Sequence, residues 1–316
     1  MQSRSSSHDR GPLIVRLCNW VGEVVLAVPT LQRLAGAGFQ LHLVGKGWAR
    51  DLLVGEGWPV VTRPHGSWQA ARQLRRLQQS LKQDEQRANA IPMLLLTKSF
   101  SSALEARLAS VSSYGYAHDG RSALLHRHYP LARGAHASHS YWHLASCLLD
   151  ESAPAPQNVT LRLHTKDLTE ASTLLATLQL SPKGYVVLCP FTGADDLQYK
   201  KVWPGFHELG NQLHASGIAC VVCPGPGEES RVTATLPHAI QLSGTRLGVY
   251  GAILQNAAAV IANDTGPGHL AAAVGARLIA IYGPQSTKYW APLGTQINLL
   301  HETSGWPAVT AVRSLL

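Results

Sequence analysis

Residues 13–34 read LIVRLCNWVGEVVLAVPTLQRL, an apolar run that passes directly into a segment with helical spacing. The apolar run has the length of a buried strand, and residues 23–34 place apolar side chains at the intervals of one helix face. The connection between them, NWVGE at 19–23, contains a glycine that allows a tight turn close to a ligand. The stretch therefore predicts a strand, a short loop and a helix, which together open a βαβ unit.

The same alternation continues along the chain. The runs FQLHLVG, WPVVT and IPMLLLTKS each precede a helix-length segment, and the pattern resumes later with GYVVLCP, GIACVVCP, AAVIAND and RLIAIYGP. Strands that alternate with helices indicate parallel sheets with right-handed crossovers, and continuous apolar runs indicate strands covered on both faces. We therefore expect the α/β class, with two doubly wound, Rossmann-like domains.

Residues 114–158 interrupt the alternation. They are rich in His, Ser, Ala and Gly and include the Pro/Ala/Ser stretch SAPAP. Such composition is typical of a linker, which we place at 151–158, between a domain at 1–150 and a domain at 159–316. Open α/β sheets bind ligands outside the carboxyl ends of their strands, so we expect the site in a cleft between the domains.

The overall composition narrows the classes of partner. The chain has 316 residues, 45% of them hydrophobic, and a formal net charge of +8 with a pI near 9.4. A basic surface favours anionic partners, but no long Lys/Arg run and no aromatic-glycine pattern of an RNA-binding sheet occurs, so we do not expect nucleic acid. The first ten residues are polar, and no apolar run reaches the roughly 20 residues of a membrane span. We interpret the start as a frayed tail of a cytoplasmic protein.

Cysteine and histidine patterns suggest no metal or disulfide site. The five cysteines lie scattered in apolar runs, and CVVC at 220–223 falls inside a predicted strand, so we interpret all of them as reduced, buried thiols. His136, His139 and His143 share one helix face, but no acidic or cysteine companion lies near them in sequence. We expect a polar surface there, and we expect neither a metal nor another cofactor.

Three loops at predicted strand ends carry residue types that bind anions. In the first, Glu23 opens a helix whose free N–H groups point at the expected cleft. An acid at this position offsets the helix dipole, and the same residue is a candidate catalytic carboxylate. Spacing alone leaves both interpretations open.

The second loop follows GYVVLCP. Thr192 and Gly193 form a turn, and Lys201 precedes a Trp-Pro pair that suits a helix start. A hydroxyl, a glycine and a lysine can together hold a phosphate, although the spacing of a P-loop is absent. A solvated loop with an outward lysine is the competing interpretation.

The third loop, NDTGPGH at 263–269, follows a strand and opens a helix of small residues. Its Asp264, Thr265, Gly266 and His269 are candidate ligand contacts, and a simple capped glycine turn is the alternative. Glu228 or Glu229, after the strand IACVVC, can accept hydrogen bonds from a ribose or can serve only as a first-turn helix acid.

These segments together resemble a known family. NDTGPGHLAAAVGARLIAIYGPQS, NWVGEVVLAVPTLQRL, KKVWP and LLLTKSFSSALEARLA with YGYAHDGRSALL are similar to elements of the ADP-heptose:lipopolysaccharide heptosyltransferases, glycosyltransferase family nine, and within it to the heptosyltransferase II branch. The resemblance runs from about residue 13 to residue 300. It implies a GT-B fold and inverting transfer of heptose from ADP-L-glycero-D-manno-heptose to the inner core of lipopolysaccharide.

The resemblance also implies roles. Glu23 stands where the family usually has the aspartate proposed as general base, and Lys201 matches the lysine that contacts the donor phosphates. The remaining donor-side positions are Thr192, Gly193, Glu228, Glu229, Asp264, Thr265, Gly266 and His269; those on the acceptor side are Trp20, Gly22, Lys98 and Arg121. Solvated surface charge is the alternative for Lys98 and Arg121.

The implied partners are ADP-heptose and an inner-core acceptor. We expect a monomer in the cytoplasm that contacts the inner membrane peripherally. Two alternatives stay open: a related glycosyltransferase that uses another nucleotide-sugar, and a catalytically idle nucleotide-sugar binder on the same fold. The extra methylene of Glu23, relative to the usual aspartate, keeps the second alternative open.

Overall fold

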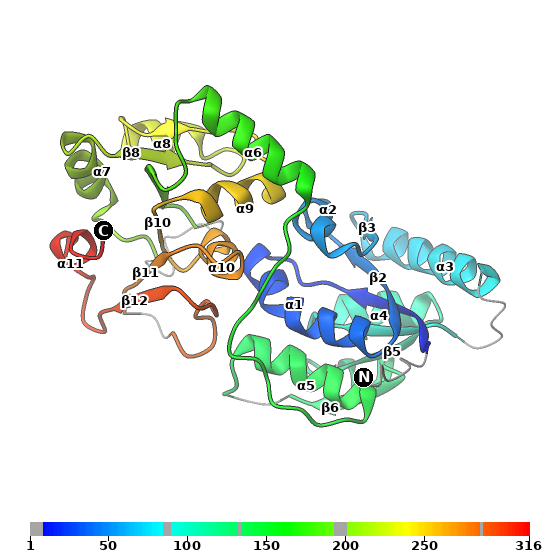
Figure 1. Cartoon of the computed structure of the whole chain (residues 1–316). Coiled ribbons are helices and arrows are strands. Elements are labelled where there is room, and N and C mark those ends of the chain that lie inside the picture. Colours follow the sequence, from blue (N-terminus) through cyan, green and yellow to red (C-terminus); the bar gives the residue numbers. More distant parts are fainter. Residues whose placement is uncertain (1–8, 85–89, 132–133, 193–200, 285–286) are drawn as a thin grey trace, which may run out of the picture. The chain divides into compact units, whose positions relative to one another are not determined.

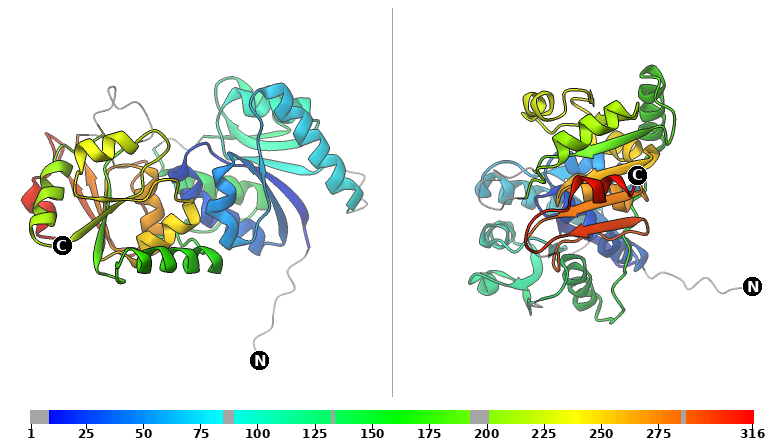
Figure 2. Two further views of the ribbon diagram at one scale, coloured as in Figure 1. Left: turned by 90° about the horizontal axis from the view of Figure 1, so that it is seen from above. Right: turned by 90° about the vertical axis from the view of Figure 1, so that its left-hand side faces the viewer.

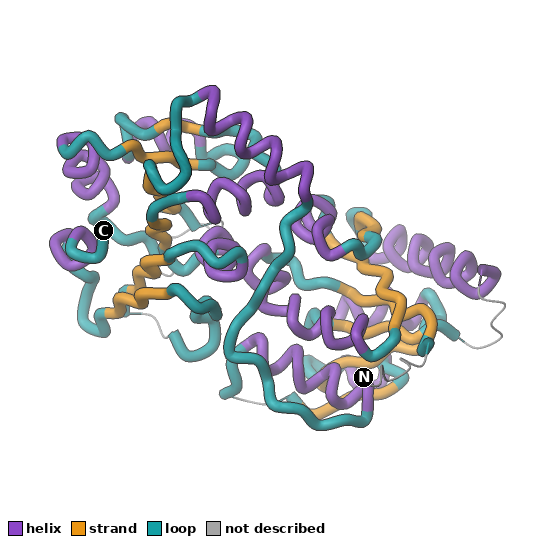
Figure 3. The backbone as a smooth tube through the Cα atoms, in the orientation of Figure 1, coloured by secondary structure: helices purple, strands orange, loops and turns teal. Residues whose placement is uncertain are grey.

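The computed structural model describes residues 9–84, 90–131, 134–192, 201–284 and 287–316. These residues form two compact units: unit 1 comprises residues up to 50 and 57–156, and unit 2 comprises 51–56 and 157–316. Each unit is built on a parallel sheet with helices on both faces (Figures 1 and 3). The expected frayed tail at residues 1–8 and Gly193 of the candidate site lie outside the described residues.

The sheet of unit 1 has six strands in the order β3-β2-β1-β4-β5-β6. The strands are β1 (Gly11–Arg16), β2 (Phe39–Gly45), β3 (Val60–Thr62), β4 (Pro92–Leu95), β5 (Ser112–Ala117) and β6 (Arg127–Pro130). The helices are α1 (Val21–Gly36), α3 (Ser67–Asp84), α4 (Phe100–Leu108), the 3-10 turn η2 (Arg121–Leu124) and α5 (Ala137–Leu149). Helices α3 and α4 supply the apolar side chains that pack on one sheet face, and α1 packs beside α5.

The sheet of unit 2 also has six strands, in the order β12-β11-β10-β7-β8-β9. The strands are β7 (Tyr185–Cys189), β8 (Ala219–Val222), β9 (Ile240–Gln241), β10 (Ala259–Ala262), β11 (Leu278–Tyr282) and β12 (Ile297–His301). The helices are α6 (Thr165–Thr177), α7 (Phe206–Ala215), α8 (Glu229–Thr235), α9 (Leu247–Asn256), α10 (Gly266–Ala273) and α11 (Val309–Arg313). Helices α7 and α11 lie side by side against one face (Figure 2), and α6 and α9 pack on each other.

The two sheets share one connectivity. Numbered from the first strand of each unit, both follow the order 3-2-1-4-5-6, with a reversal between β1 and β4 in unit 1 and between β7 and β10 in unit 2. Central strands β1 and β7 are buried at every position, as their continuous apolar runs predict. In sheets of this order, ligands bind outside the carboxyl ends of the strands at the reversal, so the loops that leave β1, β4, β7 and β10 are the candidate positions.

The expected interruption at 114–158 is wrong for much of its length. Strands β5 and β6 and helix α5 continue unit 1 through residue 149. Strand β6 lies at the sheet edge and reads RHYP, so it lacks the apolar run of a strand covered on both faces. Composition alone therefore missed it.

A short segment of the N-terminal half belongs to unit 2. Helix α2 (Trp48–Leu53) and the 3-10 turn η1 (Val54–Glu56) end within residues 51–56, which cluster with 157–316. The buried carboxylate of Glu56 accepts hydrogen bonds from the main-chain N–H of Arg162, at 2.9 Å, and from its guanidinium, at 3.0 and 3.1 Å. A Cβ on Gly55 would lie 2.0 Å from the carbonyl oxygen of Arg162, so only glycine allows this approach.

Candidate functional site

The loop after β1 places Glu23 in the first turn of α1. Trp20 is the N-cap residue and has no side-chain cap bond, while the Glu23 carboxylate accepts hydrogen bonds from the main-chain N–H groups of Asn19 and Trp20. An acid at the third helical position that reaches back to the N-cap completes half of a capping box. Burial raises the pKa of Glu23, and those two N–H groups and nearby Lys98 act in the opposite direction. Glu23 is thus both a cap and a carboxylate with enhanced basicity.

Lys98 lies in the loop after β4 and acts on Glu23 electrostatically. The fold brings them together because β1 and β4 are neighbours at the reversal of the sheet. The hydroxyl of Tyr141 and the thiol of Cys18 are 3.3 Å apart, and the charge of Glu23 acts on both of these buried groups. Burial raises the pKa of Cys18 to about 12, so this thiol stays protonated at neutral pH.

Arg121 occupies an internal position. Its side chain is fully buried, and its guanidinium donates to the carbonyl oxygens of Tyr116, at 2.9 Å, and Thr97, at 2.8 Å. It also donates to the carbonyl oxygen of Ser99 at 3.2 Å. These bonds hold the loop between β4 and α4, so Arg121 positions that loop instead of presenting its charge to an acceptor.

In unit 2, an asparagine joins three segments at the reversal of the sheet. The amide of Asn263 donates to the carbonyl oxygen of Pro190 at 2.6 Å and accepts from the main-chain N–H of Trp203 at 3.1 Å. The buried Trp203 ring donates to the carbonyl oxygen of Pro307 at 2.8 Å. Asn263 therefore fixes the ends of β7 and β10 relative to the segment that carries Lys201.

Lys201 is the cation at this edge that the sequence pattern singled out. Its ammonium lies 2.8 Å from the Asp264 carboxylate, which also accepts a hydrogen bond of 3.3 Å from the hydroxyl of Tyr282. The Lys201 side chain keeps 32% of its surface exposed and Asp264 keeps 10%. Thr192 lies in the loop after β7, is 7% exposed, and its hydroxyl has no hydrogen-bond partner among the described residues.

Helix α10 begins beside this pair. Thr265 is its N-cap residue in extended conformation, and Gly266 and Pro267 form the first turn. A Cβ on Gly268 would lie 3.3 Å from both Ala262 and the carbonyl oxygen of Asn263, so the helix start packs tightly on β10. His269 is buried in the same helix. Pro267 has no N–H, and the N–H of Gly268 donates to the carbonyl oxygen of Thr265 at 3.0 Å, so the N–H of Gly266 is the first-turn donor that suits an anion.

The acids after β8 separate in the structure. Glu228 is the N-cap residue of α8, and its carboxylate accepts the main-chain N–H of Gly225 at 2.8 Å. Glu229 occupies the first helical turn and is partly exposed. The Glu228 carboxylate therefore stabilises its own loop, whereas that of Glu229 does not take part in this bond. The sequence alone does not distinguish these two adjacent residues.

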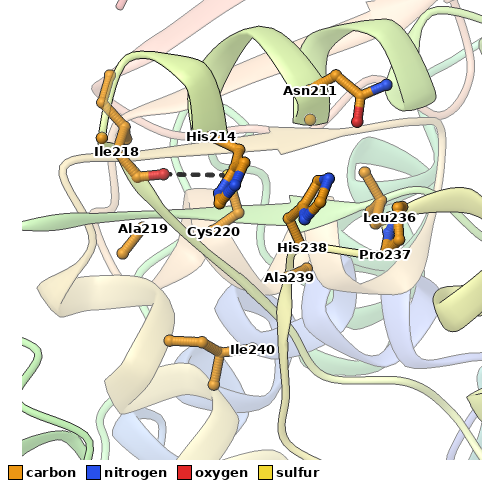
Figure 4. Close-up of a pocket in the computed structure, with 12 residues that line it drawn as sticks. Asn211, His214, Ile218, Ala219, Cys220, Leu236, Pro237, His238, Ala239 and Ile240 are labelled. Carbon is orange, nitrogen blue, oxygen red and sulfur yellow. Dashed lines mark hydrogen bonds between the residues drawn. The ribbon is translucent and has the colours of Figure 1, made fainter.

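A cavity of about 220 Å³ lies at the opposite edge of the unit 2 sheet, where β8 and β9 begin (Figure 4). The rings of His214 and His238 stack in it at 4.0 Å between centroids and 5° between planes. Parallel rings direct their nitrogen lone pairs in parallel planes, so they do not converge on one ion. Among the described residues no group of three His, Cys, Asp or Glu side chains gathers as a metal site requires, the His136 face included.

Comparison with known proteins decides the family. The model of glycosyltransferase family 9 (heptosyltransferase) matches residues 74–313. The chain belongs to glycosyltransferase family 9. This family 9 chain is 30% identical over 163 residues to lipooligosaccharide heptosyltransferase 2 of Haemophilus influenzae. That alignment covers 48% of this chain and 44% of the relative, so it spans less than half of the relative's length.

Solved structures agree in fold with this family 9 chain. A glycosyl transferase family 9 protein from Veillonella parvula has a TM-score of 0.78 at 17% identity, covering 95% of this chain and 88% of its own. E. coli ADP-heptose lps heptosyltransferase II has a TM-score of 0.73 at 22% identity, covering 92% and 90%. E. coli heptosyltransferase WaaC with ADP has a TM-score of 0.69 at 22% identity, covering 96% and 98%. The expected GT-B class of two Rossmann-like sheets is confirmed.

Several residues at these sites were not predicted from the sequence. Asn263 and Tyr282 support the Lys201–Asp264 pair, and Arg16, Lys46 and Arg63 line a cavity beside Trp20. Arg16 lies inside an apolar run, where a strand pattern gives no sign that its side chain reaches a cavity. No helix in the described part of the chain combines the length and apolar character needed to cross a membrane.

Proposed function

We propose that this protein is an inverting glycosyltransferase that moves heptose from ADP-L-glycero-D-manno-heptose to the inner core of lipopolysaccharide. The observation that carries the proposal is the partly buried carboxylate of Glu23 at the reversal of a Rossmann-like sheet in a family 9 chain. Its burial raises its pKa. A general base needs such a carboxylate, because a higher pKa makes it a better proton acceptor near neutral pH.

In the proposed reaction, Glu23 accepts the proton of an acceptor hydroxyl as that oxygen attacks the anomeric carbon of the donor sugar. The bond from that carbon to the β-phosphate oxygen breaks, and ADP leaves with the bonding electron pair. Attack from the face opposite the leaving group inverts the anomeric configuration. Lys98 keeps the deprotonated form of Glu23 accessible because its positive charge lowers the pKa that burial raises.

The unit 2 edge supplies the charges that the departing diphosphate needs. Lys201 would exchange part of its interaction with Asp264 for the phosphate oxygens, and the first turn of α10 would offer the N–H of Gly266. Thr192 would donate its unpartnered hydroxyl, with Gly193 beside it in the chain. Asp264 would contact sugar hydroxyls. Glu229 would bind the ribose in preference to Glu228, because the Glu228 carboxylate already accepts a hydrogen bond from the main chain of its own loop.

Incubation with ADP-heptose and a truncated core acceptor, followed by mass and linkage analysis, tests the proposal. Formation of a product heavier by one heptose, with inverted configuration, supports it. Transfer from another nucleotide-sugar only would replace the donor assignment. ADP binding without transfer to any core acceptor would identify an idle binder.

We also propose that unit 1 contacts the anionic face of the inner membrane from the cytoplasm. Helix α3 exposes Arg72, Arg75 and Arg76, and Trp68 at its start is 66% exposed. A basic helix face with an aromatic end suits an anionic lipid surface. Sedimentation with vesicles that contain anionic lipid should recover the wild type and much less of an Arg75→Gln, Arg76→Gln variant; equal recovery would contradict the proposal.

A further inference from the structure

A cavity of about 420 Å³ opens at the carboxyl edge of the unit 1 sheet. Its walls come from the loops after β1, β2 and β3 and from the start of α4, so it lies at the sheet reversal beside Trp20. Three cations line it, Arg16, Lys46 and Arg63, with one acid, Glu105. None of these four residues takes part in the reaction steps proposed above.

One cation is already neutralised. Arg63 donates from Nε and Nη2 to the two oxygens of the Glu105 carboxylate, at 3.0 and 2.5 Å. The Glu105 side chain is buried, and the hydroxyl of Ser67 donates to it at 3.0 Å. A bidentate pair of this kind engages both carboxylate oxygens, and Glu105 acts on Arg16 through its charge without a hydrogen bond in the described residues.

Arg16 is buried without such a partner. Its residue is 6% exposed, and its guanidinium donates to the main-chain carbonyl oxygens of Leu17 and Val44 and, at 3.1 Å, to Asn19 Oδ1. The Nε atom is buried and has no partner, and within the described residues no carboxylate pairs with this side chain. Burial lowers the pKa of Arg16 and the charge of Arg63 adds to the effect, while the charge of Glu105 acts in the opposite direction. Burial of a cation that is hydrogen-bonded only to neutral oxygens is energetically costly unless an anion binds beside it.

A lysine and the start of a helix add positive electrostatic potential to the same cavity. The ammonium of Lys46 lies 5.4 Å from the centre of the Trp20 ring, and no salt bridge of Lys46 occurs in the described part of the chain. Helix α4 begins at the wall, where Ser99 is its N-cap residue and Ser101 and Ser102 line the cavity. The hydroxyl of Ser102 donates to the carbonyl oxygen of Ser99 at 2.7 Å, and the N–H of Ser102 donates to the Ser99 hydroxyl. The N–H groups that precede Ser102 at the helix start are therefore the donors that suit the oxygens of an anion.

We infer that this cavity binds a phosphate monoester carried by the acceptor saccharide. Three cations against one acid leave the cavity lining with two net positive charges. A phosphate monoester carries about −1.5 to −2 at neutral pH, whereas a carboxylate carries only one charge. The guanidinium, the ammonium and the α4 start provide donors for three phosphate oxygens. The inference rests on the proposed function, because it names a group on the acceptor of that reaction.

The inference orders two reactions. A phosphoryl transfer to a sugar hydroxyl must supply the acceptor before this chain adds its sugar. The phosphate would then anchor the acceptor in unit 1 while the reactive hydroxyl of the acceptor approaches Glu23. Glu23 lies in the first turn of α1, close in sequence to Trp20, which lines the cavity.

Binding of inorganic phosphate to the full chain, measured by calorimetry at saturating ADP, tests the site directly, because ADP occupies the diphosphate position of unit 2. We expect the Arg16→Met and Lys46→Met variants each to lose at least about tenfold in phosphate affinity, since hydrogen bonds to charged groups contribute on this scale. Arg107→Met, an exposed charge on α4 outside the cavity, is the matched control and should bind like the wild type. Acetate should bind much more weakly than phosphate.

Unchanged phosphate affinity in both Arg16→Met and Lys46→Met would overturn the site, and equal affinity for acetate would overturn its preference for a dianion. In transfer assays, phosphatase treatment of the acceptor should raise KM at least about tenfold in the wild type and much less in Lys46→Met. Equal KM before and after treatment would overturn the claim that the acceptor carries the phosphate. Absence of transfer with phosphate binding intact would instead contradict the proposed function.

Discussion

The Nζ atom of Lys201 lies 2.8 Å from Oδ2 of Asp264, at the carboxyl edge of the unit 2 sheet. The two residues are 63 positions apart in sequence, and Asn263 holds their segments together through its bonds to Pro190 and Trp203. The lysine is therefore held beside the start of α10, where the proposed exchange of the carboxylate for a phosphate would take place.

The Lys201→Ala variant should bind ADP at least about tenfold more weakly, because it loses a charged donor to the diphosphate. Calorimetric titration with ADP measures the change. Lys166→Ala removes the same charge from an exposed position on α6 and should bind ADP normally. An unchanged ADP affinity in Lys201→Ala would remove the lysine from the donor site.

The Glu23→Gln variant should lose about 10²–10⁴-fold in kcat, the usual contribution of a general base. The amide keeps the size of the side chain and its acceptor oxygen for the helix start, so ADP affinity and thermal stability should change little. Steady-state transfer assays measure the loss. Glu151→Gln, an exposed acid of unit 1, is the control, and turnover near the wild-type level in Glu23→Gln would show that another group takes the proton.

The pH profile of kcat/KM should carry the signature of Glu23. Only the deprotonated carboxylate accepts a proton, and burial raises its pKa, so the acid limb should lie above the ordinary range of a glutamate. Lys98 lowers that pKa, so Lys98→Met should move the acid limb to higher pH. A limb that stays in place in Lys98→Met would show that a different group controls the profile.

The Gly55→Ala variant should lower the free energy of unfolding by about 1–3 kcal/mol, the usual cost of an overpacked site. The added Cβ would lie 2.0 Å from a main-chain oxygen of residue 162, so backbone must move to admit it. Urea unfolding measures the change. Gly36→Ala adds a Cβ with nothing within 4 Å, at the end of α1, and should be neutral or slightly stabilising.

The sequence was sufficient to predict the α/β class and the loops at the sheet reversals. Runs such as those of β1 and β7 are apolar at nearly every position because helices cover both faces, and this pattern is visible in the letters. Edge strands β6 and β9 were missed because they are short and partly exposed, so packing with their neighbours, not their own pattern, makes them strands.

Side-chain roles were harder to predict than loop positions. Arg121 resembles an exposed cation in sequence, yet its guanidinium is buried among main-chain carbonyl oxygens. Arg16 lies in the apolar run of β1, where alternation predicts no functional cation, and it reaches a cavity only because its strand ends there. Long-range contacts of this kind depend on strand order, which residue spacing does not carry.

The assignment of residues 51–56 to unit 2 limits how the chain can be recombined. A chimaera joined only after residue 156 would combine the Glu56 of one parent with the Arg162 of another. It would also place Gly55 of one parent against residue 162 of the other, where only a glycine leaves room for the main chain. Exchange of unit 2 between family members should therefore carry two pieces of sequence. Unit 2 is discontinuous in sequence, so a clean exchange of this unit needs three junctions in the chain, not one.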